Sequence, residues 1–265
     1  MKIAHEAPVS ILNKIDEVTD YSYCLVHLLD ENEEYKTHFQ RLVKKGREVI
    51  LDNSIFELGT AFNGEVYLNH IEKLNPAWYI IPDVLENCEQ TIQNVQEWSK
   101  YKLPQKSIGV VQGKSVEEIA YCYQNIEPYV DKVAISFDYS FFIDEELNGI
   151  LPTKFHHYVY GRDALLNNLL NVRNVINTNK PHHLLGCGLP QEFSLYRDYN
   201  WVDSVDTSNP VVAGIQNIRY NGTKGLEDKP AAKLFTLINC KLTFDQVNTV
   251  LYNVECFRSI VNDTE

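Results

Sequence analysis

Residues 107–126, SIGVVQGKSVEEIAYCYQNI, decide the fold of this chain. The apolar run at 107–112 predicts a buried strand that ends on a polar pair, Gln112-Gly113. Ser115, followed three residues later by Glu118, has the spacing of a reciprocal capping box and predicts a helix that reaches about Ile126. A strand followed closely by a capped helix is the repeating unit of a parallel α/β sheet.

The same alternation continues on both sides of this stretch. Strands are expected at 23–29, 48–52, 78–82, 107–112, 132–137, 183–186 and 201–205. Helices are expected at 31–45, 64–74, 88–100, 115–126 and 163–176, with a short one from Pro190 and a last one at 242–261. An eighth strand is not evident. No glycine-rich phosphate loop follows any strand, so an α/β fold of the (β/α)8 TIM-barrel type is favoured over an open doubly wound sheet.

The length of 265 residues suits a single barrel domain that spans 1–265, because such barrels commonly take about 250 residues. Residues 138–160 interrupt the alternation and are rich in aromatic side chains, which predicts a lid or a binding loop. No apolar stretch approaches the roughly 20 residues that a membrane span needs, and the first residues lack the apolar core of a signal peptide. We therefore expect a cytoplasmic protein, the host cytoplasm if a phage encodes it, without membrane contact.

Charge and cysteine content exclude some classes of function. The net charge of -12 argues against a protein whose whole surface grips nucleic-acid phosphates. Any such contact must be local or helped by a partner protein that supplies basic surface. Two basic segments could serve, or could be ordinary solvated surface: Arg41, Lys44, Lys45 and Arg47, and Arg219, Lys224, Lys229 and Lys233. The cysteines form no Cys-x-x-Cys pair, so neither a disulfide framework nor a zinc knuckle is indicated.

Polar residues stop several of the predicted strands, and the most informative are Asp52, Asp83, Gln112 and Asp203. The carboxyl ends of parallel strands open on one face, where these side chains would surround one ligand. Carboxylates in one pocket can divide nucleophilic and proton-transfer roles, as glycosidic-bond chemistry requires. Metal binding is the competing use of such carboxylates, but the strand ends supply no compact ligand set. Each aspartate could instead be a turn former or a helix cap.

Six short motifs occur in an order that resembles the tRNA-guanine transglycosylase (queuine tRNA-ribosyltransferase) superfamily. They are Leu51-Asp52-Asn53-Ser54-Ile55-Phe56-Glu57, Pro82-Asp83-Val84, Ser107-Ile108-Gly109-Val110-Val111-Gln112-Gly113, Ala134-Ile135-Ser136-Phe137, His183-Leu184-Leu185-Gly186-Cys187-Gly188-Leu189-Pro190 and Val202-Asp203-Ser204-Val205. The third is the most specific, because it is close to the family's Gly-Ile-Val-Gln-Gly-Gly. The resemblance covers roughly residues 48–215 and implies a β/α barrel that exchanges guanine for a 7-deazaguanine base.

The resemblance also implies roles for individual residues. Asp203 takes the place of the nucleophile, Asp52 assists proton transfer, and Asp83 and Gln112 bind the base. The remaining pocket positions are Gly113, Ser136, Phe137, Gly186, Cys187 and Gly188. Cys187 is interpreted as a small apolar lining group. Asp206 is an alternative nucleophile, because Asp206-Thr207-Ser208 replaces the family's Pro-Thr-Arg, and Ser54-Ile55 and Ser136-Phe137 replace glycine pairs.

The cysteine and histidine cluster that holds zinc in the tRNA enzymes is missing, together with much of their basic C-terminal part. The chain is therefore closest to the reduced transglycosylase-like proteins of phages and bacterial DNA-modification clusters, which implies that a preQ0-like base is placed in DNA rather than tRNA. Base exchange needs no cofactor and no metal. The alternatives are a tRNA-guanine transglycosylase, a hydrolase of nucleoside or nucleotide N-glycosidic bonds, and a non-catalytic barrel that binds a base or nucleic acid.

Overall fold

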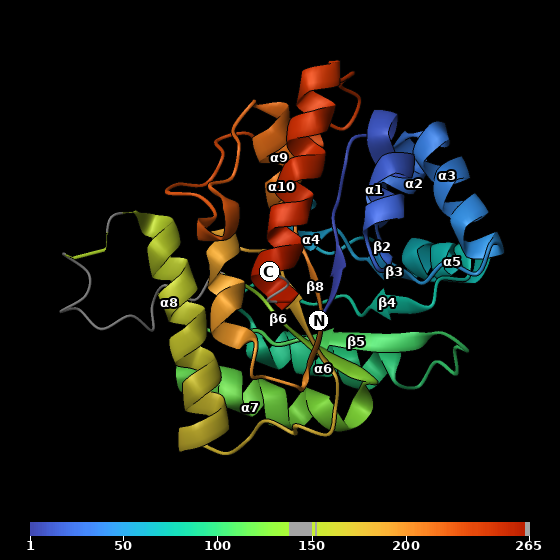
Figure 1. Cartoon of the computed structure of the whole chain (residues 1–265). Coiled ribbons are helices and arrows are strands. Elements are labelled where there is room, and N and C mark those ends of the chain that lie inside the picture. Colours follow the sequence, from blue (N-terminus) through green and yellow to red (C-terminus); the bar gives the residue numbers. More distant parts are fainter. Residues whose placement is uncertain (138–149, 152, 263–265) are drawn as a thin grey trace. The chain divides into compact units, whose positions relative to one another are not determined.

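The computed structural model describes residues 1–137, 150–151 and 153–262 (Figure 1). These residues form two compact units, one made of the described residues within 1–20, 136–172 and 184–262 and the other of 21–135 and 173–183. We call them unit 1 and unit 2 and describe each by itself. The lid predicted at 138–160 falls largely outside the described residues, and its last residues, 154–160, belong to a helix. The prediction of a single domain stays a prediction.

The strands form one eight-stranded sheet in the order β1-β8-β7-β6-β5-β4-β3-β2. They are β1 Lys2–Ala4, β2 Ser22–Leu25, β3 Val49–Asp52, β4 Trp78–Ile80, β5 Lys106–Val110, β6 Lys132–Ile135, β7 His182–Leu185 and β8 Val202–Asp206. From β2 to β8 each strand lies beside the next strand in sequence, and β1 lies beside β8. A doubly wound sheet would reverse its order at a switch point, so the fold is α/β of the (β/α)8 TIM-barrel type, as the sequence predicted.

The strand that the sequence did not reveal is β1, at the very start of the chain. It is parallel to β8, with Ile3 opposite Val205 and Ala4 opposite Asp206. Asp20 closes its other side, because its backbone N–H donates to the carbonyl of Ile3 over 2.9 Å and its carboxylate accepts from the N–H of Ile3 over 2.8 Å. A strand of three residues is too short to produce a detectable hydrophobic period, which explains why it was missed.

The helices fill the segments between the strands. They are α1 Leu12–Val18, α2 Val26–Glu31, α3 Glu33–Lys44, α4 Ile55–Leu58, α5 Gly64–Leu74, α6 Cys88–Trp98, α7 Val116–Ile126, α8 Lys154–Asn167, α9 Asn209–Ile215 and α10 Phe244–Asn262. Short 3-10 turns are η1 Val9–Ile11, η2 Glu127–Tyr129, η5 Pro190–Tyr196, η6 Gly222–Lys224 and η7 Leu234–Thr236, and a π-helical turn, η4 Asn168–Val172, follows α8. Within the described part of the chain, no helix has the length and apolar character of a membrane span.

Unit 2 contains strands β2 to β6 in continuous parallel register. Helices α6 and α7 lie side by side in this unit (Figure 1). The buried hydroxyl of Tyr67 on α5 donates to the carbonyls of Leu51 and Ile80 over 2.8 and 2.9 Å, which ties the ends of β3 and β4 together. The predicted strand at 23–29 is wrong beyond Leu25, because the chain turns into α2 there.

The capping box predicted before α7 forms only in part. Ser115 caps the helix as expected, since its hydroxyl accepts from the N–H of Glu118 over 3.2 Å. The carboxylate of Glu118, however, accepts from the N–H of Lys114 over 2.8 Å rather than from that of Ser115. The reciprocal bond has therefore moved one residue toward β5, and the start of α7 still lies close to the turn that comes after this strand.

Unit 1 contains β1, β8 and the paired helices α9 and α10 (Figure 1). Gly214 of α9 permits this pairing, since a methyl group there would lie 2.5 Å from the side chain of Val250. The buried amide of Asn253 on α10 donates to the carbonyl of Ile218 over 2.9 Å and accepts from the N–H of Tyr220 over 2.9 Å. These bonds hold the chain after α9 against α10.

Candidate functional site

The most specific arrangement in unit 2 surrounds the carboxylate of Asp83, which follows β4 and is 2% exposed. One oxygen accepts from the amide Nδ2 of Asn53 over 2.7 Å, and the other accepts from the amide Nε2 of Gln112 over 2.6 Å. Both donors follow neighbouring strands, β3 and β5. The structure therefore joins Asp83 and Gln112, two predicted site residues, by a direct hydrogen bond and adds Asn53, which the sequence did not single out.

Asp52 is the last residue of β3 and is also buried. One of its carboxylate oxygens accepts from the hydroxyl of Tyr23 on β2 over 3.0 Å. The other accepts from the backbone N–H of Ser54 over 2.6 Å. Ser54 has a φ of 59°, so the chain makes a tight left-handed turn immediately after the strand. This turn explains why a hydrogen-bonding aspartate, and a small residue two positions later, stand at the end of β3.

A cavity of about 540 Å³ opens beside Asp83 in the same unit. One wall is the segment 59–64, which connects α4 to α5, and the other is formed by Pro82 to Leu85 and by α6. Apart from Asp83 the polar lining groups are uncharged and include Thr60, Gln90 and Asn94. A cavity of this size with a few polar groups suits a small organic ligand such as a heterocyclic base.

Both polar atoms of the side-chain amide of Gln112 are hydrogen-bonded. Besides donating to Asp83, it accepts from the backbone N–H of Glu86 through Oε1 over 3.0 Å. An amide nitrogen carries two protons and an amide oxygen two lone pairs, so one of each remains for a ligand. At Gly113, a methyl group would lie 2.9 Å from Cβ of Glu118. Glycine at 113 is therefore required by the close approach of α7.

Burial determines the ionisation of Asp83. It raises the pKa of this carboxyl above its ordinary value of 3.8, and the hydrogen bonds from Asn53 and Gln112 offset the increase only in part. A carboxyl whose pKa is raised binds its proton more readily in the folded chain than in the unfolded chain.

We expect a pH dependence of folding with a defined sign. As pH rises from about 3.8 through the raised pKa, Asp83 should remove stability from the folded protein. Asp83→Asn cannot titrate, so the free energy of unfolding of the wild-type protein should fall relative to that of this variant across the same window. Chemical denaturation of both proteins at several pH values measures the difference. A constant difference would mean that burial does not shift this group.

Unit 1 holds the other predicted pocket residues, and an ion pair positions several of them. Arg162 of α8 and Glu192 of η5 are both fully buried and form a salt bridge. Arg162 also donates to the carbonyls of Leu185 and Gly186 over 3.1 Å each, and Glu192 accepts from the N–H of Gly188 over 3.2 Å. The segment after β7 is thus fixed by two charged residues that no sequence motif revealed.

Cys187 lies between these two glycines and is 1% exposed. Its sulfur is 3.2 Å from the hydroxyl of Thr207, and burial raises the pKa of the thiol. Since a protonated thiol is a poor nucleophile, these features support the interpretation of Cys187 as a lining group.

Ser136 and Phe137 follow β6 and are half-buried. Gly186 has a φ of 59°, and a methyl group there would lie 2.8 Å from the ring of Phe137. The ring also contacts Tyr158 edge to face, with centroids 5.9 Å apart, and Nζ of Lys229 lies 4.5 Å from its centroid. Phe137 therefore stands against the segment after β7, where the resemblance expected a glycine.

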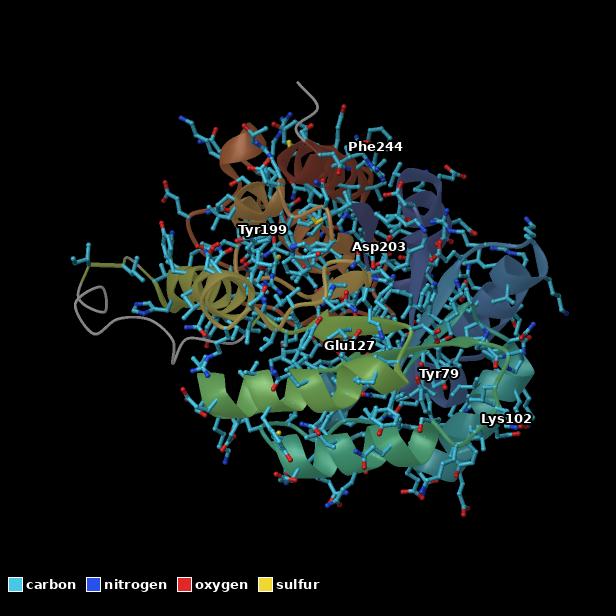
Figure 2. All side chains as sticks on the ribbon, turned by 90° about the horizontal axis from the view of Figure 1, so that it is seen from below. Tyr79, Lys102, Glu127, Tyr199, Asp203 and Phe244 are labelled. Carbon is cyan, nitrogen blue, oxygen red and sulfur yellow. The ribbon has the colours of Figure 1, made fainter. Side chains whose placement is uncertain are left out.

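The two candidate nucleophiles occupy different places on β8. The apolar run before Asp203 does not mark the end of this strand, because Asp203 is its second residue and Asp206, one residue beyond the predicted end at 205, is its last. Asp203, which is labelled in Figure 2, is half-buried, whereas Asp206 is 5% exposed. Side chains three residues apart on a strand point to opposite faces, so the two carboxylates cannot serve the same side of β8. Active sites of β/α barrels lie at the carboxyl ends of the strands, which favours Asp206.

The first basic segment of the sequence, Arg41 to Arg47, lies in unit 2. Arg41 bonds to the ring of His38 over 3.1 Å and Arg47 donates to the hydroxyl of Ser22 over 3.1 Å, whereas Lys44 and Lys45 are exposed.

Among the residues that the structure describes, no group of three or more His, Cys, Asp or Glu side chains could hold a metal ion.

A scan against protein-family models gives no match, and a search of curated proteins gives none either.

Proposed function

We propose that the protein is a base-exchange transglycosylase that replaces guanine in a nucleic acid, DNA in preference to tRNA, with a 7-deazaguanine base. The observation that carries the proposal is the buried Asp83 with its two amide partners, Asn53 and Gln112, beside a cavity of about 540 Å³. The order of the sequence motifs supplies the reaction class.

This polar group complements the hydrogen-bonding edge of guanine. The carboxylate of Asp83 uses two of its roughly four lone-pair positions on Asn53 and Gln112, which leaves positions for N1–H and the exocyclic amine of the base. The remaining proton on Nε2 of Gln112 would be donated to O6. A site built to hydrogen-bond such groups rejects bases that lack them, because its buried polar atoms would then stay unpaired.

The reaction has two displacement steps. A carboxylate oxygen of the nucleophile, Asp206, forms a bond to C1′ while the bond between C1′ and N9 breaks, and the electron pair leaves with guanine. The leaving guanine takes up a proton from a carboxylic acid, a role that the family resemblance gives to Asp52. The incoming deazaguanine returns its N9 proton to that carboxylate, and its N9 then attacks C1′ and displaces the aspartate nucleophile. The number of glycosidic bonds does not change, so neither ATP nor a redox cofactor is consumed.

Incubation with radiolabelled guanine or preQ0 and, separately, with duplex DNA, single-stranded DNA and bulk tRNA tests the proposal by the label retained in each polymer. Asp83→Asn should lower the rate of incorporation by about 10²- to 10⁴-fold, since two hydrogen bonds to a charged group are worth about 1.5–3 kcal/mol each. Asp30→Asn, which removes an exposed carboxylate of the same unit, is the matched control.

The distribution of label decides between the alternatives. Label in tRNA alone would replace DNA by tRNA as the substrate. Release of free base without incorporation would indicate an N-glycosidic hydrolase. An Asp83→Asn variant that folds and incorporates label at the wild-type rate would remove the observation on which the proposal rests. Thermal unfolding of each variant, measured alongside, separates loss of function from loss of fold.

A further inference from the structure

A second cavity, of about 470 Å³, lies entirely within unit 1. Its lining includes Arg219 and Lys224 from the chain between α9 and η7, Gln191 from η5 and His156 from α8. None of these residues has a role in the base exchange proposed above. Arg219 and Lys224 belong to the second basic segment of the sequence.

Gln191 fixes one wall of this cavity by hydrogen bonds to the backbone of Leu226. Its amide Nε2 donates to the carbonyl of Leu226 over 2.6 Å, and its Oε1 accepts from the N–H of the same residue over 3.2 Å. Gly225 completes the turn with a φ of 69°, and a methyl group there would lie 2.3 Å from Oε1 of Gln191. The segment that carries Lys224 is therefore shaped in advance of any ligand.

The charges of the cavity are predominantly positive. The guanidinium of Arg219 lies 3.7 Å from the ring centroid of Tyr252, which orients it without neutralising it. Neither Arg219 nor Lys224 forms an ion pair within the described part of the chain, whereas Glu227 also lines the cavity and opposes their field. Burial lowers the pKa of His156, so its cationic form adds little near neutral pH.

We propose that this cavity binds a phosphodiester group of the nucleic-acid strand on which the protein acts. A guanidinium, an ammonium and the second amide proton of Gln191 line one preformed cavity, and such groups donate hydrogen bonds to phosphate oxygens. A chain with a net charge of -12 needs such a local cationic site, because the rest of its surface repels a polyanion. The inference rests on the proposed function for the identity of the strand.

Fluorescence anisotropy with a labelled single-stranded oligonucleotide, titrated at several salt concentrations, tests this site. The double variant R219Q/K224Q should weaken binding about tenfold at low salt and should reduce the slope of log K against log salt by roughly 0.7 for each phosphate that the variant no longer binds. Q191A should weaken binding without changing the slope, because it removes no charge. E227Q should tighten binding, since it removes the opposing carboxylate.

The variant K44Q/K45Q removes the same charge from exposed positions of unit 2 and should bind like the wild-type protein. An R219Q/K224Q variant that keeps the wild-type affinity and salt slope would overturn the proposal, and so would a wild-type protein that binds no oligonucleotide at low salt. If the cavity binds inorganic phosphate but Arg219 and Lys224 do not affect oligonucleotide binding, the ligand is free phosphate and not a nucleic-acid strand. Binding that depends on Arg219 and Lys224 without any base exchange would leave this inference standing and reject the proposed function.

Discussion

Asp206→Asn is expected to abolish base exchange, with a fall in the rate of label incorporation of about 10⁴-fold or more. The amide cannot displace guanine from C1′, so no covalent intermediate forms. The position of Asp206 as the last residue of β8 carries this prediction, because ligands of β/α barrels contact residues at the carboxyl ends of the strands. Asp203→Asn should change the rate by less than about tenfold, since Asp203 lies near the amino end of the same strand.

Both substitutions preserve side-chain volume, and Asp198→Asn at a position before β8 is the control. Mass spectrometry of the acid-quenched protein after incubation with an oligonucleotide would locate the adduct. An adduct on Asp203, together with a fully active Asp206→Asn variant, would restore the assignment that the family resemblance implies. Full activity of both variants would exclude an aspartyl intermediate on β8.

Glu192→Ala is expected to destabilise the protein by about 3–5 kcal/mol, because it leaves the buried guanidinium of Arg162 without its counter-ion. The change should also loosen the chain after β7. Glu192 accepts a hydrogen bond from the N–H of Gly188, and it orients Arg162, whose guanidinium donates to the carbonyls of Leu185 and Gly186. Denaturant unfolding of the purified variant measures the decrease in stability.

The paired replacement R162M/E192L is the control for this prediction. It removes both charges at once and fills the space with apolar atoms, so its stability should be close to that of the wild-type protein. A Glu192→Ala variant that is destabilised by less than about 1 kcal/mol would show that the pair does not support the fold, because exposed pairs contribute that little.

The sequence determined the class of the fold because its signals are local. Apolar runs that end on polar residues, with helix caps three residues before a glutamate, depend only on neighbours in the chain. The helix at 64–74 was predicted with the bounds that α5 has, since Asn63 caps it and its apolar residues recur with the helical period. The strand β3 was predicted to within one residue, because its apolar run ends on the polar residue Asp52.

The strand β1 was not predictable in this way, whereas the end of β8 was predicted to within one residue. Ile3 and Ala4 are strand residues only because β8 lies beside them, with Ala4 opposite Asp206. Pairing partners about 200 residues apart leave no trace in a local pattern. The first strand of the barrel was therefore found only through a contact between distant segments.

The sequence by itself determined that this protein is an α/β barrel and that Asp83 and Gln112 stand at strand ends, because alternation of apolar and polar residues is a property of each segment alone. Only the tertiary structure decided which groups meet. It placed Asn53 and Gln112 on the two oxygens of Asp83, and it buried Arg162 against Glu192. Buried polar groups must find hydrogen-bond partners to offset their desolvation, and the partner is whichever group the packing of distant segments brings within reach.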